Sequence, residues 1–268
     1  MLFPISNGIK NINMKKKILL GLGALALAVV TVPMFAAFEA HVINVTATIE
    51  NALSVTTQAI DFGTVFPQEH LDKPLQIALS GSFLTATGTD YVSYIIRQKP
   101  KCGLTSLDGQ TLIGPTATGH VNPDGNGGYA INCGKEPVGY VQGQNNWGVL
   151  PSLCEYISKK SGSDELTGEN DGITYSFHKP FTTPTSTVNW NDTAGLLLKA
   201  GNQIDNWTID LSVPCFGGYC AQDWADFVDA NDGENNAIPD DYVQLIGNEH
   251  KVFGCDLWIE VTGVSRVQ

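Results

Sequence analysis

Short segments in which apolar and polar side chains alternate recur along this chain of 268 residues. Residues 172–178 and 207–213 are examples, and a period of two is typical of β-strands with one buried face. Turns rich in Gly and Asn, such as residues 122–128, separate the segments, and only residues 221–230 have a convincing helical spacing. Residues 134–172 are irregular and are expected to form long loops or an insertion. Further strands are expected in residues 53–56, 60–67, 74–80, 91–97, 129–132 and 257–262.

Many short strands with almost no helix favour one architecture over the others. We predict an all-β fold: an antiparallel β-sandwich of the jelly-roll or immunoglobulin-like type, with long loops and one short helix.

A secretory leader precedes the β-rich part of the chain. Three lysines follow Met14, the next 15 residues (18–32) are apolar and uncharged, and the small residues Ala36 and Ala37 end the segment. This run is shorter than the roughly 20 residues that span a bilayer. A basic start and a small-residue end are typical of a cleaved signal peptide. We expect residues 1–37 to hold upstream residues and this signal peptide, which signal peptidase removes during export.

An amphipathic strand is predicted directly after the leader, over residues 41–50. We assign residues 38–55 to an N-terminal strand segment of the donor type and residues 56–268 to a single β-sandwich domain. The apolar face of the strand consists of Ile43, Val45, Ala47 and Ile49.

The charge of the chain excludes two classes of partner. The formal net charge is −12, and the leader contains four lysines and no acidic residue, so the mature chain is near −16. Nucleic acids and anionic membrane surfaces repel such a chain. No second apolar stretch reaches membrane length, so we expect no stable membrane anchor and a location outside the cell or on its surface.

Six cysteines follow the leader, and an even number in an exported chain indicates disulfide bonds. Six cysteines allow 15 pairings, and the sequence does not select among them. There is no Cys-x-x-Cys pair that would indicate a zinc site. The predicted disulfide residues are Cys102, Cys133, Cys154, Cys215, Cys220 and Cys255.

Motifs for catalysis are absent from the sequence. It contains no Gly-x-Ser-x-Gly elbow, no His-Glu-x-x-His and no phosphate-binding glycine loop, and its five histidines are scattered without metal-ligand spacing. We therefore expect no enzyme, no cofactor and no metal site. Residues 229–234 place several oxygen donors in one turn, which suits Ca²⁺, but they do not fit the EF-hand register, and we favour a solvated acidic loop.

The leader ending in Phe-Ala-Ala-Phe (residues 35–38), the strand directly behind it and a β-sandwich of this size together resemble the TasA/camelysin family. That family contains secreted subunits of biofilm-matrix fibres and related archaeal bundling pili. The resemblance implies a jelly-roll subunit whose processed N-terminal strand inserts into a groove of the next subunit.

The resulting hypothesis is a secreted structural subunit that assembles with copies of itself into extracellular filaments by N-terminal strand addition. In one alternative, residues 41–50 form the first strand of their own domain. In another, the chain is a monomeric binding module for glycans, with or without Ca²⁺, that uses Trp147 and Trp190 as stacking platforms.

Overall fold

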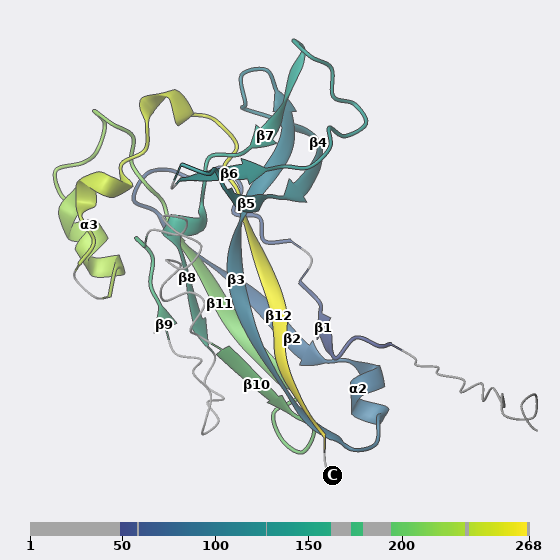
Figure 1. The fold of residues 1–268 in the computed structure, drawn as a ribbon. Coiled ribbons are helices and arrows are strands. Elements are labelled where there is room, and N and C mark those ends of the chain that lie inside the picture. The colour runs from purple at the N-terminus through teal and green to yellow at the C-terminus, as the bar shows by residue number, and fades with distance from the viewer. Residues whose placement is uncertain are drawn as a thin grey trace, which may run out of the picture. The chain divides into compact units, whose positions relative to one another are not determined.

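The computed structural model describes residues 49–57, 59–126, 128–161, 173–178, 194–233 and 236–266. The chain divides into two compact units, Met1–Ile49 and Glu50–Gln268. All the helices and strands described below belong to the second unit (Figure 1).

Five antiparallel strands form the first sheet of this unit, which we call sheet A. Their order across the sheet is β1-β2-β11-β8-β9, so strands far apart in sequence lie side by side. The strands are β1 (Leu53–Val55), β2 (His70–Leu79), β8 (Ile157–Ser161), β9 (Ile173–Thr174) and β11 (Ile204–Ser212).

The second sheet, sheet B, is built around the longest described strand, β3. Its order is β10-β3-β12, and the C-terminal part of β3 also pairs with β4 and β7. A separate hairpin, β5-β6, flanks the turn that the sequence predicts at residues 122–128. The strands are β3 (Thr89–Ser106), β4 (Leu112–Thr118), β5 (His120–Pro123), β6 (Tyr129–Asn132), β7 (Asn145–Val149), β10 (Ala194–Leu198) and β12 (Cys255–Arg266).

Helices are short in the described part of the chain. In α2 (Gly81–Thr85), the Ser80 hydroxyl oxygen accepts a hydrogen bond from the Phe83 amide at 3.0 Å, which caps the first turn. The predicted helix is confirmed as α3 (Trp224–Asn231), which buries Trp224 and Val228. None of the described helices is long and apolar enough to cross a bilayer. Three 3-10 helices complete the set: Cys154–Tyr156, Pro239–Tyr242 and Ile246–Asn248.

The two sheets pack face to face and enclose one apolar core. Alternate residues of β2, β3 and β11 point inward, because successive side chains of a strand face opposite sides. A polar link joins the sheets inside this core: Trp207 Nε1–H donates to the Tyr94 hydroxyl at 2.7 Å, and that hydroxyl donates to Asp205 Oδ2 at 2.5 Å. The predicted all-β sandwich is thus confirmed. Fully or nearly fully buried core residues include Leu75, Ile77, Val92, Tyr94, Ile96, Leu197, Trp207, Ile209 and Leu211.

Two parts of the sequence interpretation are wrong. The strand expected at residues 60–67 is an irregular segment, which bends at Gly63 with φ of +73°. The second concerns residues 134–172. Residues 134–172 were expected to be loops or an insertion, yet they supply β7 and β8, and β8 pairs along β11 within sheet A. Strand β8 is hard to recognise in the sequence because of Lys159. This residue is fully buried between the sheets and donates a hydrogen bond from Nζ to the Ile96 carbonyl oxygen at 3.1 Å. A lysine at an inward position conceals the alternation of the strand.

All six cysteines lie in the described part and form three disulfides. One bond links β3 to the residue after β6, one links the 3-10 helix before β8 to the start of β12, and one closes a small loop after β11. Such bonds persist in an oxidising compartment. The pairs are Cys102–Cys133, Cys154–Cys255 and Cys215–Cys220.

Candidate assembly groove

Strand β12 forms an open edge of sheet B (yellow in Figure 1). Along residues 257–265, no backbone hydrogen bond leads to any described segment other than β3. Natural edge strands are usually protected by lysine, proline, inward charges or bulges. Within its 12 residues β12 has no lysine and no proline, and it carries the charged residues Asp256, Glu260 and Arg266 and two register shifts near its C-terminal end. A long strand edge of this kind can accept another strand.

The inward face of β12 is incompletely covered. Val261 lies opposite Tyr94 and Val264 lies opposite Val92, so both valines face the core side of sheet B. Tyr94 and Val92 are fully buried, whereas 42% of Val261 and 45% of Val264 is exposed. Core-facing valines remain exposed at a sheet edge when no neighbouring strand shields them. Among the described residues, no further strand covers the inward side chains of β12 at this end of the sandwich.

A groove of about 280 Å³ opens beside the same strand, between the edges of the two sheets. Its walls come from β1, β2, β8, β11 and β12. Polar and apolar surfaces contribute about equally to its lining, and the apolar part suits one face of an extended segment. The apolar residues that line it include Val55, Ile60, Phe62, Leu75, Ile157, Ile209, Leu257 and Ile259.

Polar side chains at the end of the groove already have partners. The Lys101 ammonium lies 2.6 Å from Asp256 Oδ1, and the Thr118 hydroxyl donates to Asp256 Oδ2 at 2.8 Å. The Asp256 carboxylate at the start of β12 therefore helps to fix this strand.

An irregular segment runs along one side of the groove between β1 and β2. Ile60, Phe62 and Val65 pack against the core. Gly63 makes that kink with φ of +73°, and Asp61 Oδ1 accepts the Gly63 amide at 2.8 Å. This segment is not a strand and does not pair with the backbone edge of β12.

The residues predicted for the donor face are only partly described. Ile43, Val45 and Ala47 lie outside the described residues. Ile49 is described and is 93% exposed.

The tryptophans proposed for glycan stacking gain little support. Trp147 is half-buried, and its Nε1 is buried with no hydrogen-bond partner among the described residues. Trp190 lies outside them. Trp258 is 45% exposed on the outer face of sheet B, where the Lys99 ammonium lies 3.7 Å from its ring centroid.

At least one aspartate of the acidic turn at residues 229–234 has a structural role. Asp232 is buried and accepts the Ala237 amide at 2.9 Å, which holds the turn that follows α3. Asp223 Oδ1 accepts the side-chain amide of Gln68 at 3.1 Å, while Asp229 is exposed. The exposed Asp229 fits the interpretation as a solvated acidic loop, whereas the buried Asp232 does not.

The open edge of β12 is the feature that sequence reasoning missed. Its alternation predicts a strand, but a pattern within one strand does not reveal which strands neighbour it. The two apolar residues with the largest uncovered inward faces, Val261 and Val264, are three positions apart because of the register shift between them. That shift interrupts the period of two and hides Val264 from a pattern search.

No protein-family model matches the chain, and comparisons with curated proteins and with solved structures gave no significant match. The likeness to the TasA/camelysin family therefore stays a prediction from the sequence.

Proposed function

We propose that this protein is a secreted structural subunit that assembles head to tail into extracellular filaments, with the N-terminal strand of one copy added to β12 of the next. The observation that carries the proposal is the edge of β12, which no described strand pairs with and whose inward valines, Val261 and Val264, are exposed. An added strand would pair with the free backbone groups and shield the apolar side chains at the same time.

The predicted donor strand matches this edge in length and pattern. Residues 41–50 would span about 33 Å as a strand, against about 40 Å for the 12 residues of β12. Ile43, Val45, Ala47 and Ile49 would form one apolar stripe, and β12 offers a stripe of Leu257, Ile259, Val261 and Val264. Two apolar stripes of similar length are what strand addition requires.

A second copy is the favoured source of the strand. Ile49, the last residue of the apolar stripe, is almost fully exposed, and β1 begins only four residues later on the other sheet. A chain that donates its strand onward and accepts one from behind makes a heterologous contact that does not close, so it grows as a filament. The leader-like start of the chain and the three disulfides support assembly outside the cell.

The test compares the mature protein with a variant that lacks residues 38–50. We expect filaments of the mature protein by negative-stain electron microscopy, and a folded monomer by light scattering for the deletion. A synthetic peptide of residues 38–50 should bind the deletion variant, whereas a peptide with aspartate at positions 43, 45 and 49 should not. Filaments that persist in the deletion, or a mature protein that is monomeric at all concentrations, would overturn the proposal.

A further inference from the structure

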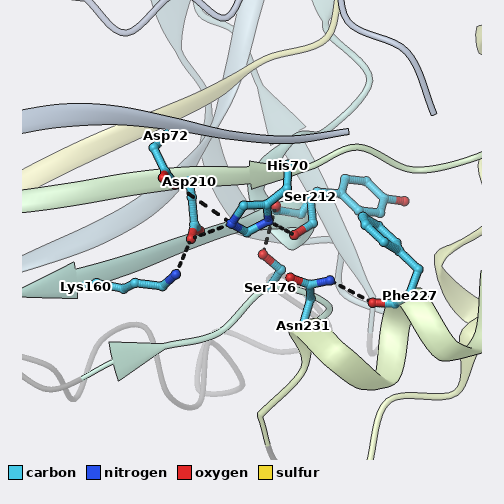
Figure 2. A network of polar contacts seen from close by, with 9 residues as sticks. His70, Asp72, Lys160, Ser176, Asp210, Ser212, Phe227 and Asn231 are labelled. Carbon is cyan, nitrogen blue, oxygen red and sulfur yellow. Dashed lines mark hydrogen bonds and ion pairs between the residues drawn. The ribbon is translucent and has the colours of Figure 1, made fainter. Parts of the chain in front are cut away.

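A cluster of polar side chains lies on the outer face of sheet A, away from the groove. His70 and Asp72 come from β2 and Asp210 from β11; Asp210 lies directly opposite Asp72, and Ser212 directly opposite His70. Residues two apart in a strand point to the same side, so the four side chains share one face. Figure 2 shows them converging, with Lys160 of β8 reaching the same point.

The distances within the cluster suit a metal ion. His70 Nε2 lies 3.3 Å from Asp210 Oδ2 and 3.8 Å from Asp72 Oδ1, and one ligand atom of each residue lies within 4.8 Å of the others. Ligands that surround Zn²⁺ tetrahedrally at about 2.0–2.1 Å are about 3.3 Å from one another. The imidazole and the two carboxylates are therefore close to the spacing of a bound ion.

The Asp210 side chain provides an independent indication of a missing ligand. It is only 1% exposed, and its Oδ1 atom is buried with no hydrogen-bond partner among the described residues. Buried carboxylate oxygens are nearly always satisfied by hydrogen bonds, because desolvating them without compensation is costly. Among the described residues, the Lys160 ammonium is the only permanently charged cation in contact with Asp210, and it lies 2.7 Å from Oδ2.

The imidazole of His70 is oriented for coordination. Its Nδ1 lies 3.4 Å from the Ser212 hydroxyl, which leaves Nε2 facing both carboxylates. Metal-bound histidines are commonly held in this way by a hydrogen bond to the second ring nitrogen. His70 is 39% exposed and Asp72 is 62% exposed, so an ion can reach the cluster from solvent.

We propose that His70, Asp72 and Asp210 bind a divalent transition-metal ion of the Zn²⁺ type. The ion displaces the Lys160 ammonium, which occupies the same negative pocket in the absence of metal. One imidazole and two carboxylates form a donor set that zinc accepts, and three protein ligands leave a fourth position for water or for a ligand from another molecule. Lys160 is 38% exposed, so its flexible side chain can move into solvent when the ion binds.

The test measures Zn²⁺ binding to the mature protein by isothermal titration calorimetry, and Co²⁺ binding by its visible absorption. We expect one saturable site per chain and the absorption of a tetrahedral Co²⁺ centre. H70Q and D72N should each weaken the affinity by more than about tenfold. Both residues are exposed, so the variants should fold, and circular dichroism checks this.

Lys160 supplies the discriminating variant. K160M removes the competing ammonium and should tighten Zn²⁺ binding by about tenfold or more. If the cluster were only a structural ion pair, K160M would destabilise the fold and bind no metal. His250, which is 73% exposed beside Glu249, serves as the matched control, and H250Q should leave the affinity unchanged. Absence of saturable binding in both wild type and K160M, or binding that survives H70Q and D72N, would overturn the proposal.

Discussion

Val261 and Tyr94 lie directly opposite each other on neighbouring strands and face the same side of sheet B, yet Tyr94 is fully buried and Val261 is 42% exposed. The difference arises because β3 has a strand on either side, whereas β12 has a strand on one side only among the described residues. Covering Val261 and Val264 is therefore the step that separates an isolated subunit from an assembled one in the function we propose.

A charge on this inward face should block assembly. The double variant V261D/V264D should fold and remain monomeric, because a donated strand would have to bury two carboxylates against its apolar stripe. We expect this variant not to bind the peptide of residues 38–50, and fluorescence anisotropy measures the binding.

The control for this experiment is I204D, which changes a residue of equal exposure (44%) on the outer face of sheet A. It should assemble like the unaltered protein. Filaments of V261D/V264D with normal morphology would show that β12 is not the acceptor.

The polar link inside the core should stabilise the sandwich. Y94F removes a hydroxyl that accepts from Trp207 Nε1–H and donates to Asp205, which deprives two buried groups of a partner. We expect the free energy of unfolding to fall by about 2 kcal/mol, measured in urea. Tyr91 on the same strand is 38% exposed, and Y91F should change the value by less than about 0.5 kcal/mol.

The disulfides should contribute unequally to stability. Cys154–Cys255 closes a loop of 101 residues and Cys215–Cys220 one of 5. The chain-entropy model gives about 5 kcal/mol for the long loop and about 2 kcal/mol for the short one. The double variant C154A/C255A should therefore lower the melting temperature more than C215A/C220A does. Equal losses in differential scanning calorimetry would contradict this order.

Two titrating groups near the 3-10 helix Cys154–Tyr156 should act on stability in opposite directions. Burial raises the pKa of the Glu155 carboxyl from 4.5 to about 7 and lowers the pKa of the His178 imidazole from 6.5 to about 4. The stability from Glu155 is present below pH 4.5 and is lost as the pH rises to 7. The stability from His178 is present above pH 6.5 and is lost as the pH falls to 4.

Between pH 4.5 and 6.5 these two contributions offset each other. In the unaltered protein, this pair should therefore leave the free energy of unfolding nearly independent of pH. E155Q should become more stable by about 2 kcal/mol as the pH rises through this range, and H178Q less stable by a similar amount. Urea unfolding at several pH values measures both slopes. Parallel slopes in the two variants would refute the assignment.

The fold class was readable from the sequence because most strands keep a clean alternation, as in residues 207–213. Strand β8 was not, because Lys159 occupies an inward position that apolar residues usually fill. The helix at residues 224–231 was predicted to within three residues, since Trp224 and Val228 recur at helical spacing. The local pattern is sufficient to predict each strand that keeps this alternation.

Both candidate sites depend on which strands are neighbours, and that information is not local. His70 and Asp210 are 140 positions apart and meet only because β2 and β11 pair in one particular register. The two-residue spacing of His70 and Asp72 is a weak signal that becomes meaningful only once Asp210 is placed opposite. The same holds for Val261, whose exposure follows from the absence of a described neighbour rather than from its own residue type.

The disulfide between Cys154 and Cys255 would carry mechanical load in a filament of the kind we propose. Tension along the fibre would enter each subunit through β1 of sheet A and leave through β12 of sheet B. The disulfide joins the start of β12 to the residues just before β8, so the force passes from one sheet to the other through a covalent bond as well as through the hydrogen bonds to β3. A reducing agent would then weaken the fibre under load while leaving its length at rest unchanged.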